Sequence, residues 1–215
     1  MEACLRYSKR EEIFNAASHG LGVLLAIAGS VIMLVYATRL GSPVSVVSAS
    51  IYGLTLITMY TMSTLYHAIS HYRAKQVLQI FDHSSIYLLI AGCYTPVTLV
   101  LLGGTPKALA LLAAVWVAAI IGVILNAVDM TRFKRIGMML YLLMGWAALL
   151  LIWDIVTLFE TAGTVLLIAG GLTYTVGVIF YKMKRIKYMH GVWHLFVLAG
   201  SILHYLCILR YVILA

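Results

Sequence analysis

The chain has 215 residues, of which 63% are hydrophobic and only 10% are charged. This composition excludes a soluble globular domain and is typical of a protein that crosses a membrane several times. The net charge of +8 does not indicate a nucleic-acid partner, because the lysines and arginines are scattered over short loops and do not gather on one face.

Long uncharged stretches, most of them near the ~20 residues that a membrane-spanning helix needs, predict seven helices. The expected helices cover residues 18–39, 46–70, 82–102, 107–128, 136–158, 162–181 and 189–212. Pro96 is expected to kink the third of them. Residues 1–17 are polar and have no apolar core of a signal peptide, so we expect a short amphipathic cytoplasmic lead-in. The sequence therefore predicts an all-α integral membrane protein with one domain over residues 1–215.

The positions of the basic residues predict the orientation of the helices. Twelve of the fifteen lysines and arginines lie in the N-terminal segment and in the second, fourth and sixth loops, whereas Arg39, Lys107 and Arg210 belong to the other side. Basic residues are enriched in the cytoplasmic loops of membrane proteins. We therefore expect the N-terminus to be cytoplasmic and the C-terminus to lie outside.

The last expected helix, with the stretch YMHGVWHLFVLAGSILHY, carries the most unusual polar residues. Imidazole side chains are costly in a membrane and mark functional sites there. His190 and His194 are four residues apart and so lie about 6 Å apart on one face of a helix. Two histidines at this spacing can bind one metal ion, and further ligands must then come from other helices.

Other polar residues are expected at the same depth in the membrane. His67 precedes the basic second loop, and Asp82 follows it. At 1.5 Å per residue, these two residues and the pair His190 and His194 lie roughly 5–10 Å inside the cytoplasmic boundary. Ser63 lies one helical turn deeper than His67, where its hydroxyl can bond a metal-bound water. The candidate metal ligands are His67, His190 and His194.

Each of these residues has a simpler interpretation. A histidine in a helix is often a hydrogen-bonded core residue, Asp82 can be a paired structural carboxylate, and Ser63 can serve helix packing. His19, at the cytoplasmic start of the first helix, is a reserve ligand. His204 lies about 15 Å along the helix axis from His194, too far to share its ion, and is expected to be a packing or hydrogen-bonding residue.

The segments EEIFNAASHG, STLYHA, FDHSSIYLLIAGCYTP and HGVWHLFVLAGSILHY resemble the signature regions of the bacterial hemolysin III family, within the superfamily of progestin and adipoQ receptors and alkaline ceramidases. The resemblance covers nearly the whole chain. It implies a resident of the bacterial cytoplasmic (inner) membrane with a zinc ion near the cytoplasmic leaflet. The family's SxxxH falls on Ser63 and His67, its aspartate on Asp82, and its HxxxH on His190 and His194.

Zinc also suits these residues chemically, since three neutral imidazoles leave a fourth position for a water whose pKa falls to about 7. Asp82 could deprotonate that water and later protonate a leaving group, and Ser63 could orient it or stabilise an oxyanion. The resemblance to ceramidases implies an amide or ester of a membrane lipid as substrate. The leading hypothesis is a zinc-dependent lipid hydrolase. The alternatives are a zinc-stabilised sensor or regulator of membrane state and, less favoured, a hemolysin-like pore.

Overall fold

The computed structural model describes residues 7–39 and 42–215, and every regular element within them is a helix. In this described part of the chain, seven helical stretches are long and apolar enough to cross a membrane, which confirms the predicted fold class. They are Lys9–Arg39, Pro43–Ala68, Tyr72–Leu101, Pro106–Asp129, Lys134–Leu158, Thr161–Lys182 and Met189–Ile213. The chain is therefore an all-α, multi-pass membrane protein.

Four of the spans are single α-helices, and three change their hydrogen-bonding pattern along their length. The uninterrupted helices are α1 (Lys9–Arg39), α2 (Pro43–Ala68), α4 (Pro106–Asp129) and α7 (Thr161–Lys182). The interrupted spans are α3 (Tyr72–Pro96) with the π-helical turn η2 (Val97–Leu101), α5 (Lys134–Trp146) with the 3-10 turn η3 (Ala147–Leu151) and α6 (Ile152–Leu158), and α8 (Met189–Ile208) with the π-helical turn η4 (Leu209–Ile213). The change in α3 comes directly after Pro96, which lacks the backbone N–H of other residues.

The first helix begins at Lys9 and not at residue 18, because a capping box precedes it. Glu11 Oε2 accepts hydrogen bonds from the backbone N of Ser8 at 2.9 Å and from Ser8 Oγ at 2.7 Å, and the backbone N of Glu11 lies 3.4 Å from Ser8 Oγ. Residues 9–17, expected as part of a separate lead-in, are therefore the first turns of α1. The Ser-x-x-Glu spacing that causes this start is visible in the sequence.

The third helix also begins earlier than expected, at Tyr72 and not at residue 82. His71 caps it, since its Nδ1 accepts a hydrogen bond from the backbone N of Ala74 at 3.4 Å. Asp82 consequently lies inside α3 and not at its first turn.

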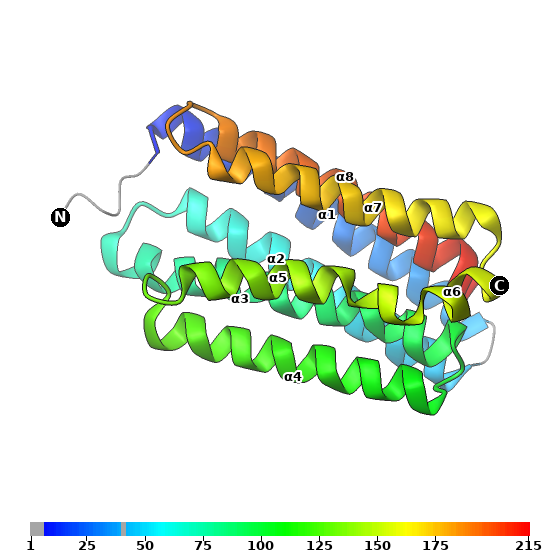
Figure 1. The fold of residues 1–215 in the computed structure, drawn as a ribbon. Coiled ribbons are helices and arrows are strands. Elements are labelled where there is room, and N and C mark those ends of the chain that lie inside the picture. The colour runs from blue at the N-terminus through cyan, green and yellow to red at the C-terminus, as the bar shows by residue number, and fades with distance from the viewer. Residues whose placement is uncertain (1–6, 40–41) are drawn as a thin grey trace.

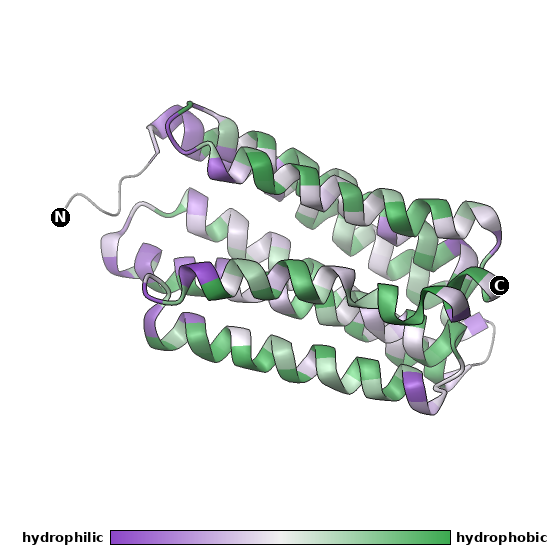
Figure 2. Cartoon of the chain, viewed as in Figure 1, coloured by the Kyte–Doolittle hydropathy of each residue, from purple (hydrophilic) through white to green (hydrophobic). Residues whose placement is uncertain are grey.

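The start of α1 and the connections α2–α3, α4–α5 and α7–α8 lie at one end of the bundle, and the chain ends at the other (Figure 1). Figure 2 shows that strongly hydrophilic residues gather at the first of these ends, while the middle of the helices is mostly hydrophobic. We refer to this end, with the start of α1 and these three connections, as the polar end.

Close contacts hold α2 and α8 against α1. α1 packs along both of these helices, and α7 packs along α8 (Figure 1). A Cβ atom on Gly22 of α1 would overlap the ring of Tyr60 in α2, and a Cβ atom on Gly191 of α8 would overlap the ring of Phe14 in α1. These glycines therefore allow the approach that brings the end of α2 and the start of α8 together beside α1.

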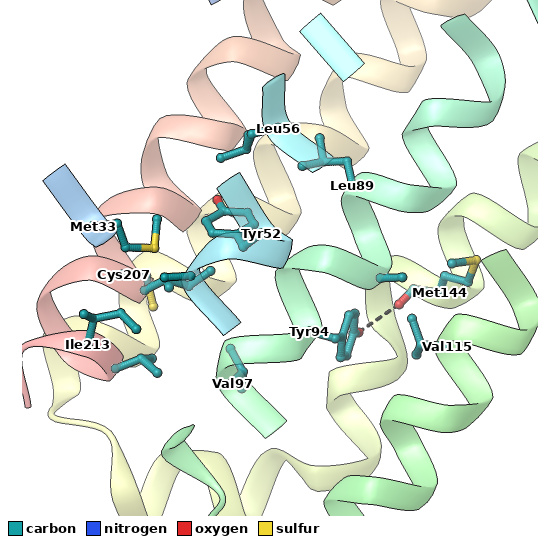
Figure 3. Packing of buried hydrophobic residues seen from close by; sticks show 14 of the residues in the cluster. Met33, Tyr52, Leu56, Leu89, Tyr94, Val97, Val115, Met144, Cys207 and Ile213 are labelled. Atoms are coloured by element: carbon teal, nitrogen blue, oxygen red, sulfur yellow. Dashed lines mark hydrogen bonds between the residues drawn. The ribbon is translucent and has the colours of Figure 1, made fainter. Parts of the chain in front are cut away.

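The apolar core lies away from the polar end. Figure 3 shows part of it, where Met33 of α1, Tyr52 of α2 and Cys207 of α8 are all buried. The hydroxyl of Tyr94 in α3 donates a hydrogen bond to the backbone carbonyl of Met144 in α5 at 2.8 Å, so the polar group of this buried side chain is satisfied. This core fixes the helices whose other ends carry the buried polar residues.

Candidate metal centre

Three histidine side chains meet at the polar end of the bundle. His67 lies in the last turn of α2, and His190 and His194 lie one turn apart at the start of α8. Nε2 of His190 is 3.3 Å from Nε2 of His67 and 3.1 Å from Nε2 of His194. Within residues 7–39 and 42–215, this is the one group of three or more His, Cys, Asp or Glu side chains whose possible ligand atoms all lie within 4.8 Å of one another. The three predicted ligands are thus brought together.

The other ring nitrogen of His67 is held by a carboxylate of α1. His67 Nδ1 lies 2.6 Å from Glu12 Oε2, and the His67 side chain is fully covered. A carboxylate only accepts hydrogen bonds when ionised, so Nδ1 carries the proton. In the neutral imidazole, Nε2 of His67 then presents a lone pair to the other two histidines.

The ring of His194 is oriented in the same way by the backbone of α1. His194 Nδ1 lies 3.2 Å from the carbonyl oxygen of Asn15 and 3.2 Å from Ser18 Oγ. Because Ser18 Oγ donates its own proton to the Asn15 carbonyl at 2.9 Å, both oxygens accept from Nδ1. Nε2 of His194 therefore also presents a lone pair to the centre of the cluster.

The chemistry of this donor set fits a metal ion. Lone pairs on Nε2 of His67 and Nε2 of His194 both face Nε2 of His190, which carries at most one proton and can donate it to only one of them. A divalent cation can accept a lone pair from all three nitrogens at once. Imidazole is a good ligand for zinc and for several other transition metals, and three histidines form known catalytic zinc sites.

His19, the reserve ligand, lies beside this cluster and outside it. Its ring stacks on that of His194 with 3.6 Å between centroids and 11° between planes. Both ring nitrogens of His19 are buried and have no hydrogen-bond partner among the described residues. The ring also packs edge-on against Tyr60. His19 thus supports the face of His194 and is not one of the three ligands that converge.

Ser63 and Asp82 both line a cavity of about 320 Å³, together with His19, His190 and His194. Ser63 Oγ is buried and has no hydrogen-bond partner among the residues that the structure describes. Asp82 is largely buried, and its Oδ2 lies 3.5 Å from Nδ1 of the neighbouring His83. The two residues expected to carry chemistry therefore face the same space as two of the three candidate ligands.

The cavity has a polar part and an apolar part. It includes two exposed residues, Thr131 of the α4–α5 connection and Lys134 at the start of α5, so it reaches the surface at the polar end. Its other walls are mostly hydrophobic and aromatic, and they include Tyr52, Met59, Leu89, Ile90 and Val197. A molecule with a polar group and a hydrocarbon chain matches this lining.

His204 lies away from the metal candidates, as its position in α8 predicts. Its Nε2 lies 3.1 Å from the carbonyl oxygen of Leu167, and its Nδ1 lies 3.5 Å from Cys93 Sγ. The ring is thus a hydrogen-bonded packing residue between α3, α7 and α8.

Sequence reasoning missed the residues that surround the histidines. Their sequence positions place Glu12 and Asn15 in the expected polar lead-in and Lys75 in the basic second loop. A signal was present in the spacing, because Glu12, Asn15 and His19 follow one another at three and four residues and so share one helical face. Because α1 is helical from Lys9 onward, these residues share one face, and that face contacts His67 of α2 and His194 of α8.

The fold and this cluster define a seven-helix membrane protein with a group of three histidines, two of them buried and His190 partly buried, near one end of the bundle. A family model described as "Haemolysin-III related" matches residues 7–205. The chain belongs to this family, as its sequence motifs indicate.

Relatives of the chain include both bacterial and mammalian proteins. "Hemolysin-3" of Bacillus cereus is 40% identical over 95% of this chain and 93% of its own length. "Hemolysin-3 homolog" of Bacillus subtilis (strain 168) is 41% identical over 95% of this chain and 96% of its own length. "Monocyte to macrophage differentiation factor" of Homo sapiens is 31% identical over 94% of this chain and 84% of its own length. The similarity therefore extends over almost the whole helical bundle.

Proposed function

We propose that this protein is a zinc-dependent hydrolase that cleaves an amide or ester bond of a membrane lipid. The observation that carries this proposal is the shared cavity: His190 and His194 of the three-histidine cluster line it, and so do Ser63 and Asp82. Its apolar walls suit a hydrocarbon chain, and the polar groups at one end suit the bond to be cleaved.

His67, His190 and His194 would hold the zinc ion, and the ion would supply the Lewis acidity that makes a water molecule more acidic. Asp82 is the residue that can move the proton. Its ionised carboxylate accepts a proton from the water that attacks the lipid carbonyl, and then gives that proton to the departing amine or alcohol. Ser63 Oγ, buried and without a partner among the described residues, donates a hydrogen bond to the carbonyl oxygen as negative charge develops there.

This function is tested by incubating the purified protein in lipid nanodiscs with a panel of lipid amides and esters and measuring released fatty acid. We expect turnover of at least one class, its loss after removal of metal with a chelator, and its return when zinc is added. No turnover across the panel by fully zinc-loaded protein would refute the hydrolase.

A second candidate function is a regulator of membrane state in which zinc acts only as a clasp. It is supported by the contacts of α1, which hold histidines of both α2 and α8. The name of the human relative also refers to cell differentiation and not to hydrolysis.

The names of the bacterial relatives refer to haemolysis, and a pore is the least favoured hypothesis. Release of haemoglobin from red cells by the purified protein, with no lipid turnover, would favour it.

We also propose that the protein resides in the inner membrane of a bacterium and that its polar end faces the cytoplasm. Most of the lysines and arginines outside the membrane belong to this end, and such residues are retained on the cytoplasmic side. In reporter fusions, we expect an alkaline phosphatase fused to the C-terminus to be active and one fused to the N-terminus to be inactive. A cytoplasmic reporter should give the opposite result at each end. Both termini on one side of the membrane would contradict the seven-span topology.

A further inference from the structure

The carboxylate of Glu12 makes two short contacts that link three parts of the polar end. Its Oε2 lies 2.6 Å from His67 Nδ1 on α2, and its Oε1 lies 2.9 Å from Lys75 Nζ on α3. The exposed fraction of the Glu12 side chain is 14%, while those of His67 and Lys75 are 0% and 4%. Buried charges need partners, and each oxygen of Glu12 has one.

Lys75 is itself fixed in position. Its Nζ donates a hydrogen bond to the carbonyl oxygen of Tyr66 at 2.8 Å and lies 4.8 Å from the centre of the Tyr66 ring. Because Tyr66 directly precedes His67, the ammonium group is anchored to the same turn of α2 that carries the candidate ligand. Lys75 therefore both balances the charge of Glu12 and holds its carboxylate beside His67.

The neighbouring Glu11 has a different task. Its Oε1 accepts a hydrogen bond from the backbone N of Tyr188, immediately before α8, at 2.9 Å, and its Oε2 bonds Ser8. No hydrogen bond or ion pair joins Glu11 to a histidine among the described residues. Of these two adjacent carboxylates, Glu12 alone bonds a histidine and Lys75 among the described residues, whereas Glu11 bonds Tyr188 and Ser8.

We propose that Glu12 is a positioning residue for the metal, acting through His67, and that Lys75 holds it in place. A carboxylate that accepts from the outer nitrogen of a metal-binding histidine fixes the tautomer and the direction of the ring and makes the inner nitrogen a stronger ligand. Glu12 contacts Nδ1, whereas Nε2 of His67 faces the other histidines. This role rests on the metal centre of the proposed function but not on the hydrolysis of a lipid.

The test compares Glu12→Gln with Glu11→Gln in the full-length protein, purified in detergent and freed of metal. Each protein is titrated with Co²⁺, and binding is followed through the visible d–d bands of the ion. Glutamine keeps one acceptor oxygen at either position, but it removes the charge and replaces the second oxygen by an NH2 donor. We expect Glu12→Gln to bind Co²⁺ about 10- to 100-fold more weakly than the wild type, as is usual when the outer partner of a ligand is changed.

Two further measurements, the wavelengths of the d–d bands and the melting of the metal-free protein, distinguish a positioning role of Glu12 from other roles. The d–d bands should keep their wavelengths in Glu12→Gln, because the three nitrogen ligands remain. The metal-free variant should still melt in one cooperative transition, at a lower temperature than the metal-free wild type, because the buried Lys75 loses its charged partner. Glu11→Gln should bind Co²⁺ like the wild type.

Several results would overturn this role. Unchanged affinity in Glu12→Gln, or an equal loss in both variants, would show that the bond to His67 has no specific effect. Shifted bands would make Glu12 a ligand, and loss of the cooperative melting transition without metal would make its role structural. A wild type that binds no Co²⁺ would refute the metal centre itself, whereas the absence of lipid turnover in the nanodisc assay would refute only the hydrolase.

Discussion

His194→Ala is expected to abolish stoichiometric zinc binding. The wild type should contain about one zinc per chain, held by His67, His190 and His194. The substitution removes one of three converging nitrogens, so the loss of affinity should exceed the ~10- to 100-fold loss that follows from changing an outer partner. Elemental analysis of the purified protein, set against its concentration from amino-acid analysis, gives the stoichiometry directly.

The matched control is His204→Ala, which removes a histidine from the same helix. His204 bonds Leu167 and lies beside Cys93, away from the cluster, so its loss should leave the zinc content unchanged. Gel filtration shows whether either variant still folds as a single species. An equal loss of zinc from both variants would contradict the assignment of the three ligands.

Asp82→Asn is expected to lower the rate of lipid hydrolysis by about 10²- to 10⁴-fold, the usual contribution of a general acid or base. The amide keeps the shape of the side chain and cannot accept the proton of the attacking water. Zinc content should stay at the wild-type level, because Asp82 is not among the three converging ligands. The measurement is fatty-acid release at equal zinc content and saturating substrate.

The control for this variant is Asp154→Asn, the same chemical change at an exposed position in α6. Its hydrolysis rate should match that of the wild type. If Asp82→Asn is as active as both, Asp82 is not the base. A loss of zinc from Asp82→Asn would instead make Asp82 a ligand and support the clasp, in which protein groups fill the whole coordination shell.

The number of spans and the depth of the histidines follow from sequence patterns that depend on few assumptions. In a membrane, the backbone N–H and C=O groups of a long uncharged stretch find hydrogen-bond partners within that stretch only if it forms a helix. The number of such stretches therefore predicts the number of helices in the bundle. Similar distances of His67, His190 and His194 from basic loops predict that they lie in one layer. That reasoning works because each helix rises by a constant amount per residue.

The surroundings of the cluster were harder to predict, because they depend on where α1 begins and on how it turns. In the sequence, charge alone separates a membrane span from its flanks, so the charged Glu12 and the nearby Asn15 are predicted to belong to a polar lead-in. The capping box of Ser8 and Glu11 extends the helix to Lys9, and only then do Glu12 and Asn15 share a face. Partners such as Lys75 depend on side-chain packing across helices, which has no signal in spacing.

The most direct test of a zinc centre built from three histidines is X-ray absorption at the zinc edge, on protein purified without added metal. We predict that zinc is present, with a first shell of nitrogen and oxygen at about 2.0–2.1 Å. The outer-shell pattern should be that of several imidazole rings and should be lost together with the zinc in His194→Ala. Zinc-free protein, or a first shell with sulfur at about 2.3 Å, would contradict a centre formed by His67, His190 and His194.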